Sequence, residues 1–267
     1  MSLSNTSLQK KFRKKAITKV ITGLSNFNLN DIVIKIKAAE LAKATYVDIA
    51  AHPDIVISAK SISTLPICVS SISPTDLYNC VLAGAEIIEI GNFDIFYNYG
   101  ISFSELQILK LAEETRALFK NIIICVTIPH ILPLERQIKL AIQLENLGID
   151  LIQTEGKSSK NQDLCLTRSH IINSSYKSSC PLSSAYALSR VIQTPIIASS
   201  GLDNLSAPIA IACGASGVGI GSALNQFTNI SLMANYLQEI VSSIDYNRGS
   251  ISCVIQKSIS LNSKILT

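Results

Sequence analysis

The sequence has no tryptophan, only three histidines, and few charged or aromatic residues. Charged side chains make up 16% and aromatic side chains 6% of the 267 residues, and the formal net charge is only +4. We therefore expect no nucleic-acid-binding surface, which would need a basic patch. The histidines (His52, His130 and His170) are far apart and share no ligand spacing, so we expect no metal site.

The chain also lacks any Cys-x-x-Cys pair, although it contains seven cysteines. Several of them lie inside apolar runs, where cysteine behaves as a small core residue, and this favours a reducing compartment. No apolar run reaches the roughly 20 residues that a membrane-spanning helix needs. The uncharged stretch 204–238 is interrupted by Pro208 and four glycines. The sequence thus predicts a soluble protein with no membrane partner.

Short apolar runs alternate with helical patterns along the chain, and 48% of all residues are hydrophobic. Strands of a parallel sheet covered by helices are apolar on both faces. Eight such repeats predict a single (β/α)8 TIM barrel. An open doubly wound sheet is the alternative, and it would carry its phosphate loop after the first strand. The expected strands are 16–21, 46–50, 66–70, 85–90, 122–127, 150–154, 195–199 and 216–220.

We expect the barrel to span residues 16–243, with a basic segment at 1–15 and a tail at 244–267. Segment 1–15 is interpreted as a helix at the bottom of the barrel, and a transit peptide is the alternative. The polar connection 155–180 is longer than ordinary βα loops, which suggests a functional or lid-like role. The sixth barrel helix is expected to begin at Pro181.

The most informative stretch is 194–226, TPIIASSGLDNLSAPIAIACGASGVGIGSALNQ, in which two short strands each end at a glycine turn. The loops after strands 7 and 8 of such barrels form phosphate sites, and glycine lets an anion approach the backbone. The alternative is that these glycines only make tight turns. We predict a phosphate-binding site at the carboxyl-terminal face, formed by Ser200, Gly201, Gly221 and Ser222.

Several polar residues lie in, or directly after, otherwise apolar strands. Because a buried unpaired charge is costly, we interpret them as the reacting end of a site at the barrel mouth. A buried ion pair that only fixes strand packing is the alternative. A desolvated Lys19 could form a Schiff base or act as a base, whereas Asp48 nearby would keep it protonated. The candidate catalytic residues are Lys19, Asp48, Glu89, Gln153 and Glu155.

Five stretches together resemble an uncharacterised TIM-barrel family encoded in algal plastid genomes and found in cyanobacteria. They are GNFDIFYNYG (91–100), VTIPHILPLE (126–135), DLIQTEGK (150–157), SSAYALSR (183–190) and SSGLDNLSAPIAIACGASGVGIGSALN (199–225). The resemblance implies a TIM barrel made inside the plastid, in the stroma, with no need for a transit peptide. It brings no established activity.

The last two strands are also similar to those of ribulose-phosphate-binding barrels and of flavin-mononucleotide (FMN) oxidoreductases. Our first hypothesis is an enzyme of lyase, aldolase or isomerase type that acts on a small phosphorylated metabolite. An FMN-binding oxidoreductase and a non-catalytic metabolite sensor are the alternatives. The sequence leaves the cofactor and the oligomeric state open.

Overall fold

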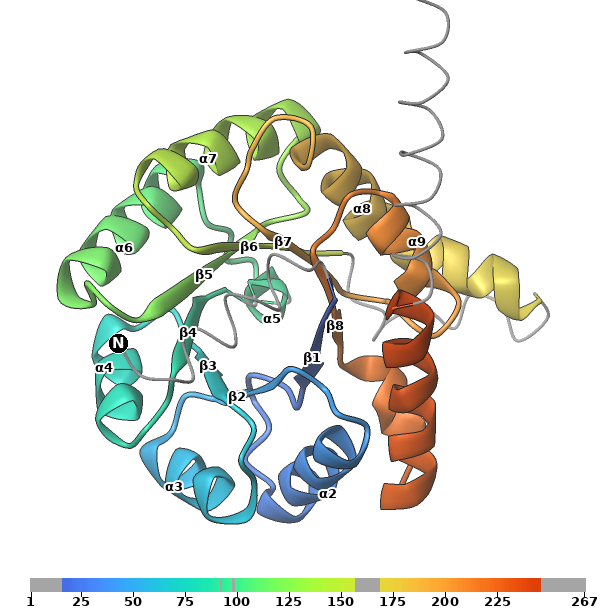
Figure 1. Ribbon diagram of the computed structural model, residues 1–267. Coiled ribbons are helices and arrows are strands. Elements are labelled where there is room, and N and C mark those ends of the chain that lie inside the picture. The colour runs from blue at the N-terminus through green and yellow to red at the C-terminus, as the bar shows by residue number, and fades with distance from the viewer. Residues whose placement is uncertain (1–15, 92, 98, 157–168, 246–267) are drawn as a thin grey trace, which may run out of the picture.

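The computed structural model describes residues 16–91, 93–97, 99–156 and 169–245. Eight parallel strands pair in sequence order, and β8 pairs with β1 to close the barrel (Figure 1). The predicted (β/α)8 barrel is confirmed, and the open-sheet alternative is wrong. The strands are β1 (Ile17–Ile21), β2 (Tyr46–Ala50), β3 (Ile67–Ser70), β4 (Ile87–Ile90), β5 (Ile123–Ile128), β6 (Leu151–Thr154), β7 (Ile196–Ser199) and β8 (Gly217–Ile220).

Helices form a ring around the barrel, while the short helix α5 lies inside that ring in the view along the barrel axis (Figure 1). None of the helices that the structure describes could cross a membrane. The helices are α2 (Leu29–Leu41), α3 (Pro53–Ile62), α4 (Pro74–Leu82), α5 (Asp94–Tyr97), α6 (Glu105–Leu118), α7 (Leu134–Asn146), α8 (His170–Leu188), α9 (Ser206–Ala212), the 3-10 helix η2 (Ser222–Gln226) and a last helix over 230–245.

The barrel interior is built in layers, because successive residues of a strand face opposite sides. One layer is an apolar cluster that includes Ile17, Tyr46 and Leu151. Two residues further along these strands lie Lys19, Asp48 and Gln153, all buried. The polar layer therefore lies on the carboxyl-terminal side of the apolar one, where barrel sites are built.

The sixth barrel helix differs from its sequence prediction. It begins at His170, with Ser169 as its N-cap, so Pro181 lies inside α8 rather than at its start. Proline has no N–H and leaves the carbonyl four residues earlier, that of Lys177, without its helical donor. Residues 170–180 of the connection 155–180 are therefore helical, because Ser169 caps the helix well before Pro181. Residues 157–168 lie outside the described residues.

Gly201 packs against the carbonyl group that Pro181 leaves free. A Cβ atom on Gly201 would lie 2.4 Å from the Lys177 oxygen, and the Gly201 φ is +70°. We expect Gly201→Ala to lower the free energy of unfolding by roughly 2–3 kcal/mol. The control is Gly148→Ala, where φ is +80° but nothing lies within 4 Å. Its expected loss is about 1 kcal/mol, and equal losses in urea unfolding would contradict the packing argument.

Residues 1–15 and 246–267 lie outside the described residues, so the barrel-bottom helix and the tail stay predictions. Helix 230–245 extends to the end of the last described range.

Candidate active site

A cavity of about 450 Å³ lies at the carboxyl-terminal ends of the strands. Its walls come from the segments that follow β1, β6, β7 and β8, together with α5. Lys19, Asp48 and Glu89 do not line it, and lie buried beneath. The predicted site residues that do line it are Gln153, Glu155, Ser200, Gly201, Gly221 and Ser222.

Lys19 is the centre of a buried polar network. Its Nζ lies 2.9 Å from Asp48 Oδ2, donates to Gln153 Oε1 at 2.9 Å, and also donates to Glu89. The Lys19 side chain is fully buried. Four residues that are far apart in the sequence thus meet inside the barrel, from β1, β2, β4 and β6.

The network keeps Lys19 charged. Burial alone lowers the pKa of Lys19, but the attraction of Asp48 and Glu89 outweighs burial and raises this pKa well above its ordinary value. A protonated lysine is not a nucleophile, so the surroundings oppose Schiff-base chemistry at Lys19. Burial raises the pKa of Asp48 from 3.8 to about 6, even though Lys19 acts in the opposite direction.

Glu89 connects this network to the floor of the cavity. Its Oε1 accepts hydrogen bonds from Thr127 Oγ1 at 3.0 Å and from Gln153 Nε2 at 2.7 Å. Thr127 and Gln153 both line the cavity. Because Lys19 can only donate, the Gln153 amide oxygen must face it, and the orientation of the amide is fixed.

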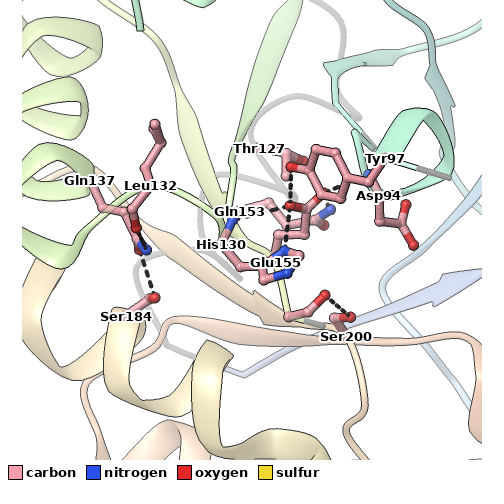
Figure 2. A network of polar contacts seen from close by, with 11 residues as sticks. Asp94, Tyr97, Thr127, His130, Leu132, Gln137, Gln153, Glu155, Ser184 and Ser200 are labelled. Atoms are coloured by element: carbon pink, nitrogen blue, oxygen red, sulfur yellow. Dashed lines mark hydrogen bonds and ion pairs between the residues drawn. The ribbon is translucent and has the colours of Figure 1, made fainter. Parts of the chain in front are cut away.

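Glu155 forms a second network that fixes the rim of the cavity (Figure 2). Its Oε1 accepts from the Asp94 N–H at 2.9 Å, and its Oε2 accepts from the Tyr97 hydroxyl at 2.7 Å. The His130 N–H donates to the same Oε2 at 3.1 Å, and His130 Nδ1 lies 3.0 Å from it. Burial, and then the Glu155 charge, raise the pKa of Tyr97. Glu155 therefore holds α5 and the loop after β5 together.

The turns after β7 and β8 differ in how they use glycine. Gly201 is explained by the contact with Lys177, and its neighbour Ser200 has a φ of +83°. At Gly221, φ is −127° and an added Cβ would come no closer than 3.4 Å to Ile21. Packing therefore does not demand a glycine at 221, and the space beside its Cα is open to a ligand.

Lys35 is a cavity residue that sequence reasoning missed. It lies on α2, is 4% exposed, and its Nζ contacts Asp31 Oδ2 at 2.8 Å and Asn225 Oδ1 at 3.2 Å. The available signal was its place in the apolar stripe of the helix, three residues after Ile32 and one turn after Asp31.

These features define a (β/α)8-barrel protein with a polar cavity at its carboxyl-terminal face. The chain belongs to the family described as protein of unknown function (DUF561), whose profile matches residues 3–250. Uncharacterized protein ycf23 of Antithamnion sp. is 44% identical over 272 residues, 98% of each chain. The same protein of Cyanophora paradoxa is 40% identical and covers 91% of this chain and 98% of its own. The resemblance to the uncharacterised plastid family is confirmed.

Solved barrel structures share the fold at low identity. Thiamine phosphate pyrophosphorylase from Pyrococcus furiosus is 14% identical, with a TM-score of 0.58 and coverage of 88% of this chain and 98% of its own. (S)-3-O-geranylgeranylglyceryl phosphate synthase from Thermoplasma acidophilum is 14% identical, with a TM-score of 0.59 and coverage of 91% and 98%. At such identities the likeness shows the fold alone.

Proposed function

We propose that this protein binds a small phosphorylated metabolite in the plastid stroma and acts on it as a lyase, aldolase or isomerase. The main support is that the predicted phosphate turns and part of the predicted reacting end share one cavity. Ser200, Gly201, Gly221 and Ser222 line it together with Gln153 and Glu155. Its volume, about 450 Å³, falls within the range of small-molecule sites.

In this proposal the phosphate group binds between the turns after β7 and β8, where backbone N–H groups and the Ser222 hydroxyl can donate to it. The rest of the metabolite extends over Gln153 and Thr127. Lys19, Asp48 and Glu89 act from beneath the floor. Their charges would reach the ligand through Thr127 and Gln153, which line the cavity and donate hydrogen bonds to Glu89.

The chemistry of other barrels supports this class of ligand. The Thermoplasma acidophilum synthase was solved in complex with its substrate sn-glycerol-1-phosphate. Another barrel of similar fold is 3-hexulose-6-phosphate synthase. Both names describe phosphorylated ligands of those proteins, and for this chain they motivate the choice of test ligands.

The phosphate site is tested at Gly221. We expect Gly221→Leu to weaken the binding of phosphorylated metabolites at least tenfold, about 1.4 kcal/mol, because its side chain would occupy the space assigned to phosphate. Gly221→Ala should weaken binding less, and both variants should fold. Binding is measured by 31P NMR titration with inorganic phosphate and triose, pentose and hexose phosphates, and folding by thermal unfolding. Unchanged affinity in folded Gly221→Leu would refute the phosphate site.

Native mass spectrometry of gently purified protein, with an absorbance spectrum of the same sample, separates the reaction classes. We expect a colourless phosphorylated adduct. A retained flavin mass with a visible absorption band would replace this proposal by the oxidoreductase alternative. Tight binding with no turnover of any phosphorylated metabolite tested would favour the sensor.

A further inference from the structure

We propose that Lys35 provides the positive charge of the phosphate site, and that it exchanges its partner Asp31 for the bound anion. This inference rests on the proposed function and adds the residue that neutralises the ligand. The turns themselves, Ser199–Gly201 and Gly221–Ser222, contain no cationic side chain. A phosphate group binds most strongly where charged donors face it. Lys35 lines the same cavity as both turns.

The position of Lys35 next to η2 brings its ammonium group close to the turn after β8. Lys35 Nζ donates to Asn225 Oδ1 at 3.2 Å. Asn225 is three residues after Ser222 on η2, and residues with this spacing lie above one another in a 3-10 helix, about 6 Å apart along its axis. Lys35 Nζ also donates to the Thr22 carbonyl oxygen at 3.4 Å. The ammonium group thus lies between the end of β1 and η2, within reach of an anion at Ser222.

Asp31 is a partner that Lys35 can give up. The Asp31 carboxylate lies 2.8 Å from Lys35 Nζ, but its side chain is 41% exposed, whereas that of Lys35 is 5% exposed. Because Asp31 is partly in water, it can turn into solvent, at the cost of this ion pair and of the hydrogen bond that Asn26 Nδ2 donates to Asp31 Oδ2 at 2.6 Å. An incoming phosphate oxygen would take its place, and the three Lys35 protons would keep three acceptors.

A second feature of the same wall indicates a ligand independently. Thr22 lines the cavity, and its hydroxyl is buried and has no hydrogen-bond partner among the described residues. Buried hydroxyl groups in folded proteins are nearly always paired, and one without a partner calls for an explanation. A phosphate oxygen held by Lys35 would provide the missing acceptor once the Thr22 side chain changes rotamer.

The test compares inorganic phosphate binding, by 31P NMR at constant ionic strength, in full-length wild type and four variants. Lys35→Met removes the charge and the donor, and Lys35→Gln keeps a donor without the charge. Both should weaken binding roughly tenfold to a hundredfold. Asp31→Asn removes the competing carboxylate and should tighten binding about two- to fivefold. Lys37→Met, at an exposed position of the same helix, should change nothing.

The opposite signs at Lys35 and Asp31 separate anion binding from a structural role. If the ion pair only stabilised α2, then Asp31→Asn would weaken phosphate binding just as the Lys35 variants do. Weaker binding in Asp31→Asn would therefore overturn the inference. Unchanged affinity in folded Lys35→Gln, with loss in Gly221→Leu, would also overturn it while the proposed function stands. If wild type binds neither inorganic phosphate nor any phosphorylated metabolite, both proposals fail.

Discussion

Replacing Lys19 with methionine is expected to lower the free energy of unfolding at pH 7 by about 3–5 kcal/mol, the usual cost of leaving a buried charge unpaired. The variant would leave Asp48 and Glu89 facing each other in the barrel interior without the ammonium group that now contacts both. Chemical denaturation at several pH values would measure this. The loss should shrink as the pH falls towards 4, because burial raises the pKa of Asp48 to about 6 and its protonation removes one of the two facing charges.

Two controls separate the buried charge from ordinary side-chain loss. Lys60→Met breaks a partly exposed pair with Glu86, 3.0 Å long, and should cost at most about 1 kcal/mol. If Lys19→Met does not fold at pH 7, the triple variant Lys19→Met, Asp48→Asn, Glu89→Gln should restore folding, because no buried charge is then unpaired. A loss for Lys19→Met no larger than for Lys60→Met would contradict the network as described.

The second large effect is a pH dependence of stability that originates at Asp48. Its pKa is about 6 in the folded protein, against an ordinary value of 3.8. Between pH 4 and 6 the folded protein retains this proton while the unfolded chain loses it, so stability falls as the pH rises. The contribution of Asp48 is fully present below pH 4 and absent above pH 6, a difference of about 3 kcal/mol.

Asp48→Asn should remove this dependence. The asparagine can still bond to Ser70 and Lys19, and Lys19 keeps Glu89 as its counter-ion. Other carboxyl groups, such as Glu40 and Glu145 with lowered pKa values, make stability rise with pH. The informative quantity is therefore the difference between wild type and variant, measured by urea unfolding from pH 4 to 7. A constant difference over this range would show that Asp48 does not titrate as described.

The barrel could be predicted from local patterns because each strand is a short apolar run bounded by turn residues. Helix starts were harder. Asn28 caps α2, although Asn30 and Asp31 beside it are also residues that cap helices, and Ser169 caps α8 well before Pro181. Several polar residues could start each helix, and sequence alone does not rank them. In α8 the Lys177 carbonyl, which Pro181 leaves without its helical donor, lies against Gly201 in the turn after β7, a contact that the local sequence does not show.

The candidate site was only partly predictable. Polar residues in apolar strands signalled Lys19, Asp48, Glu89 and Gln153, because a charge in a covered strand must have a partner somewhere. Which partner each takes depends on strand stagger around the closed barrel. Lys35 was not predictable as a site residue, because a lysine on an amphipathic helix ordinarily faces water.

By itself, the sequence determined the number and order of strands, the glycine turns after the last two, and the presence of buried charge, because these follow from local composition and the cost of burial. Only the tertiary structure decided that the polar residues divide into two levels. Lys19, Asp48 and Glu89 lie beneath the floor, while Gln153, Glu155 and Lys35 line the cavity. That division depends on barrel closure, which brings residues from distant strands to one height and sets the depth of each.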